Sequence, residues 1–219
     1  MNRGRFEAFS DGVFAVAITL LVLDLAVAGP GPGHGSLAHQ LAHRWPGFAA
    51  YVISFLTIGI IWVNHHALVS NLKVVTRPLM FLNLLLLMFV VLVPFTTATV
   101  ANYLADGGFD AQVAVAVFGG AMLGMSVSFA AMFEWSLGEG RAYVSVPRDK
   151  RWAARFRFTS GGLVYLAIIG IAFLSAPVAF GLAGATGVYY IFERTPVIPK
   201  PEGQSQGRSQ GQSEGQPDG

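Results

Sequence analysis

A carboxylate stands near the start of the first long apolar segment of this chain of 219 residues. Asp11 follows Ser10 and precedes the mainly apolar residues 12–23. An ionisable group inside a membrane span is costly unless it faces the protein interior, a polar partner or water, so Asp11 is a candidate for ion chemistry. It also lies near the amino-terminal end of a predicted helix, where free N–H groups and the helix dipole stabilise an anion. A structural capping role therefore stays open beside direct ligand chemistry.

The histidines are the other side chains whose types suit chemistry. His65 and His66 are neighbours, so on a helix they point about 100° apart and are poorly placed to hold one metal ion together. His39 and His43 have the i, i+4 spacing of a helical metal pair, but no carboxylate or cysteine accompanies them, which favours a solvated loop. We therefore expect no metal site and no cofactor. His65 is interpreted as a packing and hydrogen-bonding partner, with pH sensing as the alternative.

Composition places these residues in a membrane protein. Hydrophobic residues make up 53% of the chain and charged residues only 12%, against about 25% charged residues in an ordinary soluble domain. The absence of cysteine excludes disulfides, thiolate metal sites and cysteine nucleophiles. With no serine elbow and no metal cluster, we expect that the chain is not an enzyme. The net charge is only +2 and the basic residues flank apolar runs, so no nucleic-acid partner is expected.

Six membrane spans follow from runs of about 20 apolar residues. The first four spans are predicted at about residues 6–28, 45–70, 78–103 and 111–137. The run over residues 156–192 is too long for one span, and a Ser-Ala-Pro turn at 175–177 predicts its division into two short spans. Pro94 is expected to kink the third span. Gly120 and Gly124 have the spacing that lets two helices pack closely.

The layout of charge predicts the topology. Placing the amino terminus in the cytoplasm puts the lysines and arginines on that side, with Arg44 outside. We therefore expect a multi-pass protein of the cell membrane with residues 1–194 as a six-helix domain, and a disordered cytoplasmic tail at 195–219. Both termini are then cytoplasmic, and the Gly/Pro/His-rich residues 29–39 form an outer loop. The basic amino terminus and the apolar run after it also resemble a cleavable signal peptide, which would leave five spans.

The first helix has two faces. Its apolar row, at 100° per residue, consists of Val16, Leu20 and Leu23, with Thr19 beside them. Ser10 and Asp11 point about 120° and about 140° away from that row, so they are expected to face neighbouring helices. Periodicity alone also permits a lipid-facing or core role for the apolar row. Asp24 lies near the carboxyl end, where the dipole disfavours an anion, so we expect it in water at the outer mouth, where a ring of such groups would concentrate cations.

The pattern Arg5-xxx-Phe9-Ser10-Asp11, followed by Ala15-Val16-xx-Thr19-Leu20-xx-Leu23-Asp24-Leu25, resembles the signature of the transmembrane protein 175 family, the lysosomal potassium channel and its prokaryotic relatives. A weaker likeness lies in Trp62-xx-His65-His66. The resemblance implies an all-α channel with six transmembrane helices per subunit. It further implies a homotetramer in which the first helices line a central pore. The implied partners are other copies of the chain, membrane lipids, and potassium with other monovalent cations.

The resemblance also implies roles for single residues. Rings of apolar side chains on the first helix would select the ion, at Val16, Thr19, Leu20 and Leu23. A narrow apolar ring strips water from potassium at a lower cost than from sodium. Val16 is shorter than the isoleucine or leucine that the family carries there, so the tightest ring could instead lie at Leu20 or Leu23. A polar network is implied to orient the pore helix, and its members are Arg5, Phe9, Ser10, Asp11 and His65.

A proton-coupled secondary transporter is the alternative function. Asp11 and His65 would then form a proton relay. Transporters of that kind usually carry internal repeats or broken helices at paired positions, and neither is detected in this sequence.

Overall fold

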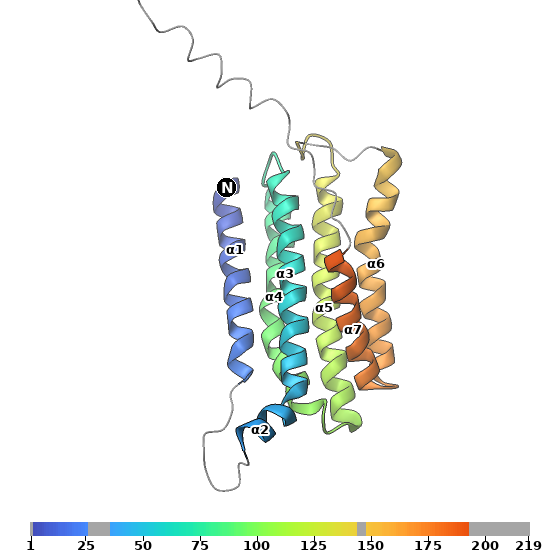
Figure 1. The fold of residues 1–219 in the computed structure, drawn as a ribbon. Helices are drawn as coiled ribbons and strands as arrows, with labels where there is room; N and C mark the ends of the chain where they lie inside the picture. Colours follow the sequence, from blue (N-terminus) through green and yellow to red (C-terminus); the bar gives the residue numbers. More distant parts are fainter. Residues whose placement is uncertain (1, 26–35, 144–147, 193–219) are drawn as a thin grey trace, which may run out of the picture.

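The computed structural model describes residues 2–25, 36–143 and 148–192, and these residues form an all-helical bundle. The elements are α1 (Arg3–Leu20), the 3-10 helix η1 (Leu21–Leu25), α2 (Leu37–His43), α3 (Trp45–Ser70), α4 (Arg77–Tyr103), α5 (Gly108–Ser136), α6 (Arg148–Ala172) and α7 (Ala176–Phe192). All helices except the short α2 run along a shared direction, with α1 at one edge of the bundle and α6 at the other (Figure 1). The predicted tail, residues 195–219, lies outside the described residues.

Four of the described helices are long and apolar enough to cross a membrane: α1 with η1, α3, α4 and α5. The second predicted span has the same bounds as α3, and the third and fourth differ from α4 and α5 by a few residues. Residues 26–28 of the first predicted span are outside the described part. The predicted break within residues 156–192 is confirmed as a division into two helices, because α6 ends at Ala172 and α7 begins at Ala176. Neither helix is among the four candidate spans, so their role as spans stays a prediction.

Proline and glycine explain where several helices begin and end. Pro46 and Pro78 are the second residues of α3 and α4, where a missing N–H leaves no intrahelical bond unmade. Gly107 has a φ of 71°, a backbone region that residues with a Cβ rarely adopt, and it turns the chain from α4 into α5. Helix α4 continues through Pro94.

A short helix occupies a segment that the sequence analysis predicted as a loop. Ser36 caps α2, because its hydroxyl accepts a hydrogen bond from the backbone N–H of His39 at 3.3 Å. The rings of His39 and His43 are exposed and stack with centroids 6.3 Å apart. The loop prediction is therefore wrong for these residues, because the serine cap and the following leucine and alanine residues favour a helix. Residues 29–35 of that predicted loop lie outside the described ranges.

The helices pack in an order that leaves α1 with few neighbours. Helix α1 packs on α3 and α4, α4 packs on α5, α5 packs on α6, and α7 contacts α3, α5 and α6. At the α4–α5 contact, a Cβ on Gly124 would collide with the ring of Phe89, whereas a Cβ on Gly120 would meet nothing within 4 Å. Only the second glycine of the predicted pair therefore serves close packing in this subunit.

Candidate pore helix and its supporting network

The residues predicted to line a pore lie on an exposed row of α1. Val16 is 56% exposed, Leu20 39% and Leu23 67%. Thr19 is also exposed, and its hydroxyl donates to the carbonyl oxygen of Val16 at 2.9 Å. The residues of α1 and η1 that are buried in the subunit are Phe6, Ser10, Phe14, Ala17 and Leu21. The first helix therefore turns an apolar face away from its own bundle.

A chain of hydrogen bonds holds the opposite side of α1, and each donor and acceptor in it is fixed by the neighbouring bond. The Ser10 hydroxyl donates to the carbonyl oxygen of Phe6 at 3.0 Å, so it accepts from Asn83 Nδ2, also at 3.0 Å. Asn83 Oδ1 is then the acceptor for His65 Nε2 at 2.7 Å. Since an amide oxygen only accepts, Nε2 carries the hydrogen, and in the neutral imidazole Nδ1 is then the unprotonated nitrogen of the ring.

This chain joins three helices inside the subunit. Ser10 on α1, His65 on α3 and Asn83 on α4 are each at most 1% exposed. The His65 ring also packs against Phe6 and Phe14, with ring centroids 6.4 and 5.4 Å away. A buried polar group that loses its partner costs about 1–3 kcal/mol, so the network favours one rotation of α1 about its axis. That rotation keeps the apolar row exposed.

Asp11 belongs to a second set of contacts between α1 and α3. Its Oδ1 accepts a hydrogen bond from Trp62 Nε1 at 2.9 Å. One turn earlier, Glu7 Oε1 lies 2.9 Å from His66 Nδ1. Asp11 is half-buried and lies off the apolar row, as the helical geometry predicts. Its hydrogen-bond partner lies on a neighbouring helix, which agrees with an orienting role.

Arg5 and Phe9 were also predicted as network members. Within the subunit, neither joins the hydrogen-bond chain of Ser10, Asn83 and His65. Both are exposed, and Phe9 is 53% exposed. Within residues 2–25, 36–143 and 148–192, Arg5 forms no hydrogen bond or ion pair. Arg3 instead contacts α3, donating to the carbonyl oxygen of Ser70 at 3.1 Å. Arg5 and Phe9 lie toward the same open side as Val16, so their implied roles stay predictions that depend on a neighbouring subunit.

Asp24 lies in η1, which follows the predicted pore helix α1. Its side chain is exposed in η1, and its carbonyl oxygen accepts from Arg44 Nη1 at 3.5 Å. The position is compatible with the predicted outer mouth.

Two contributors were not identified from the sequence. Asn83, the centre of the buried chain, is a lone amide in the apolar run of residues 79–93, and that isolation was the available signal. Glu7 precedes Asp11 by four residues, a spacing that places both carboxylates on one face of a helix. Its partner His66 is distant in sequence and could not be inferred from spacing.

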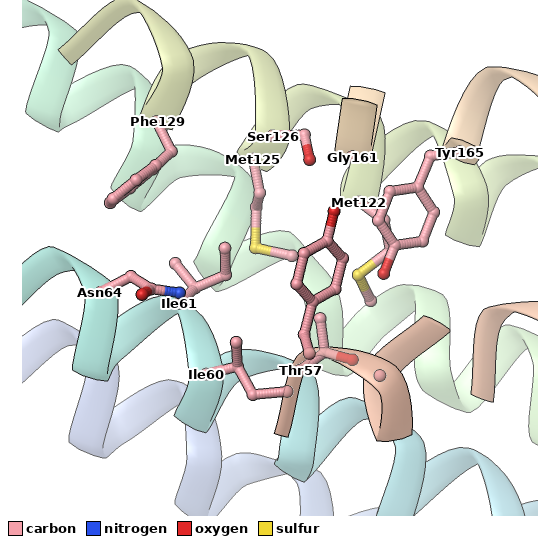
Figure 2. A pocket seen from close by; sticks show the side chains of 12 residues that line it. Thr57, Ile60, Ile61, Asn64, Met122, Met125, Ser126, Phe129, Gly161 and Tyr165 are labelled. Carbon is pink, nitrogen blue, oxygen red and sulfur yellow. The ribbon is translucent and has the colours of Figure 1, made fainter. Parts of the chain in front are cut away.

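A cavity lies on the other side of the bundle. It measures about 70 Å³ and is lined by residues of α3, α5, α6 and α7. Figure 2 shows Asn64, Ser126 and Tyr165 among neutral polar groups, with methionine and isoleucine side chains between them. None of the residues predicted for the pore or its network lines this cavity.

Comparison with known proteins identifies the family. The model of the family described as endosomal/lysosomal potassium channel TMEM175 matches residues 5–94. A protein of Streptomyces collinus named as a potassium channel is 46% identical over 197 residues, which cover 89% of this chain and 94% of the relative. The chain belongs to the transmembrane protein 175 family. This is a family of ion channels, so the expectation that the chain is not an enzyme is confirmed.

A solved structure resembles most of the chain, and an animal relative resembles less than half of it. The crystal structure of a lysosomal potassium-selective channel TMEM175 homologue from Chamaesiphon minutus superposes with a TM-score of 0.76 at 33% identity, covering 86% of this chain and 96% of the other. The human relative, named an endosomal/lysosomal proton channel, is 41% identical over 97 residues, which are 41% of this chain and 19% of the human protein. The matched family region contains α1, α3 and most of α4, the helices that the buried network joins.

Proposed function

We propose that this protein is a potassium-permeable cation channel formed by four copies of the chain. In this proposal the α1 helices surround a central pore, and ions pass the side chains of the apolar row. The bacterial relatives named as potassium channels support the choice of ion. No cofactor is required, because the permeant ion moves through the pore without a chemical reaction.

One observation carries the proposal. Helix α1 contains the family signature, yet Val16, Leu20 and Leu23 remain exposed at the edge of the bundle while its polar side is fixed by Asn83 and His65. In a membrane span an open apolar face meets lipid or another subunit, and the family signature on the same helix favours the second. In a fourfold assembly around α1 the apolar row lines the shared pore.

Selection in this proposal follows from dehydration at narrow apolar rings. Side chains at Val16, Leu20 and Leu23 offer no oxygen ligands to replace the water around an ion. Passage then costs less for potassium than for the more tightly hydrated sodium, and an apolar constriction can also close by dewetting. Thr19 adds a hydroxyl ring between the first two apolar rings, and Asp24 concentrates cations at the outer mouth.

The topology completes the proposal. We assign α6 and α7 as the fifth and sixth spans, which gives both termini a cytoplasmic position in the cell membrane. The basic residues at the amino-terminal ends of α1 and α6, together with Arg141 between α5 and α6, then face the cytoplasm. Residues 195–219 form a cytoplasmic tail in this arrangement.

Ion flux through purified protein in liposomes tests the function. Vesicles with a potassium gradient are expected to show protein-dependent flux that is larger for potassium than for sodium. The variant Leu20→Asn should hydrate the constriction and raise the flux of both ions. Its matched control is Leu166→Asn, at a leucine that is 57% exposed on α6. Well-folded tetramers without potassium flux would contradict the proposal.

Proton permeation is the second candidate. It is favoured by the animal relatives, which are named proton channels and match the chain over 97 residues. The simple relay from Asp11 to His65 has less support, because Asp11 accepts from Trp62 whereas His65 bonds to Asn83. A pH-sensitive dye inside the same liposomes separates the candidates, since proton flux without potassium flux would favour the second.

A further inference from the structure

Three metal-ligating side chains meet where α1 and α3 are in contact. Glu7 and Asp11 come from successive turns of α1, and His66 comes from α3. One ligand atom of each lies within 4.8 Å of the other two. In the sequence His66 stands beside His65, a spacing that predicts no shared metal site. The fold instead places it against two carboxylates that are more than fifty residues away.

We propose that Glu7, Asp11 and His66 form a binding site for a divalent transition-metal ion of the zinc type. One imidazole nitrogen and two carboxylate oxygens are a ligand set that Zn²⁺ accepts, with water in the fourth position. Binding does not depend on the proposed channel function. The ion would bridge the pore helix to α3.

The distances require little movement to hold such an ion. Tetrahedral coordination with bonds of about 2.0–2.2 Å places ligand atoms roughly 3.3 Å apart. His66 Nδ1 and Glu7 Oε1 are already 2.9 Å apart. The Asp11 ligand atom lies within 4.8 Å of both, so it must approach by at most about 1.5 Å, within the reach of a rotamer adjustment. The His66 and Glu7 side chains are 52% and 20% exposed, which leaves a path for the ion.

Neighbouring side chains orient the ligands. Trp62 Nε1 donates to Asp11 Oδ1 at 2.9 Å and so leaves Oδ2 available. The Trp62 ring also packs against His66, with centroids 6.1 Å apart. In established metal sites, hydrogen bonds from neighbouring side chains to the ligands hold those ligands in position. The two carboxylates share one histidine, so the cluster carries an excess of negative charge that a divalent cation neutralises.

Calorimetric titration of the full-length protein with Zn²⁺ tests the proposal. The protein is purified through a tag without histidine, and His39→Ala and His43→Ala remove the exposed pair on α2 that could bind zinc by itself. We expect one ion per subunit in this background. Co²⁺ in place of Zn²⁺ should give the visible absorption of a low-symmetry, four-coordinate ion.

Variants separate a metal site from an ion pair. His66→Ala and Glu7→Gln change partly exposed side chains and should weaken Zn²⁺ binding by more than about 100-fold. Trp62→Phe should weaken it by about 10–100-fold, as expected for a residue that only orients a ligand. Glu139→Gln, at an exposed carboxylate after α5, should have no effect. Absence of stoichiometric binding, or binding that survives His66→Ala, would show that the cluster is an ion pair only.

Discussion

Ser10 is the smallest member of the buried network and the one that links it to α1. Its hydroxyl accepts from Asn83 and donates within its own helix, so both of its hydrogen-bonding roles are used. A larger side chain would not fit at a fully buried position between α1 and α4. The hydrogen bonds and the tight burial at this position therefore explain why this chain has a serine there in the family signature.

Replacing Ser10 by alanine should destabilise the protein. The change leaves Asn83 Nδ2 without its acceptor inside the bundle, which is expected to cost about 1–3 kcal/mol. Thermal unfolding of purified protein in one detergent measures the loss as a lower midpoint. The control is Thr186→Ala, which removes an exposed hydroxyl bonded only to the Leu182 carbonyl oxygen of its own helix. Equal midpoints for the two variants would contradict the role given to the network.

Val16 is the position where this chain departs from the family pattern, and its size bears on selectivity. Extending the side chain with Val16→Leu narrows the proposed ring, so the ratio of potassium to sodium permeability should rise. Reversal potentials in mixed-ion solutions measure the ratio. Val22→Leu makes the same change at an exposed valine away from the row and should leave the ratio unchanged. If Val16→Leu also leaves it unchanged, the selecting ring is not at this residue.

At the scale of elements, the α4–α5 contact depends on one glycine. Phe89 of α4 occupies the space that a side chain on Gly124 of α5 would need, whereas the space beside Gly120 is open. The two glycines lie on the same helix one turn apart, so they form a matched pair for substitution.

Gly124→Ala should destabilise the bundle and Gly120→Ala should not. In the first variant the Phe89 ring must move out of its position, and overpacking of this kind typically costs about 1–3 kcal/mol. In the second variant, alanine improves helix propensity in the absence of a clash. Unfolding midpoints in detergent compare the variants, and a larger loss for Gly120→Ala would overturn the assignment of the contact.

The sequence predicted the elements better than the contacts between them. Long apolar runs, the prolines at the starts of α3 and α4 and the turn before α7 are local signals, and the structure follows them. The cap at Ser36 is also local, but the Gly/Pro-rich residues before it suggested a loop. Asn83 and the pairing of Glu7 with His66 depend on which helices become neighbours. That information is not contained in the periodicity of any single segment.

At the scale of the whole molecule, the buried network and the exposed row act together. The network is enclosed within one subunit and fixes the orientation of α1, while the row is left for contacts that one subunit does not supply. The cavity among α3, α5, α6 and α7 lies on the opposite side and contains none of these residues. An assembly around α1 would therefore leave that cavity at the periphery.

The absence of cysteine makes the proposed assembly directly testable. Leu20→Cys introduces one thiol per subunit on the row that should face the fourfold axis. Disulfides require Cα atoms within about 7 Å, a separation that neighbouring pore helices reach only at a narrow ring. Mild oxidation in liposomes should therefore yield covalent dimers on a non-reducing gel and reduce potassium flux, and reductant should reverse both. Leu166→Cys, exposed on α6, should stay monomeric on the gel. Dimers from the α6 variant but not from the α1 variant would place another helix at the centre and remove α1 from the pore.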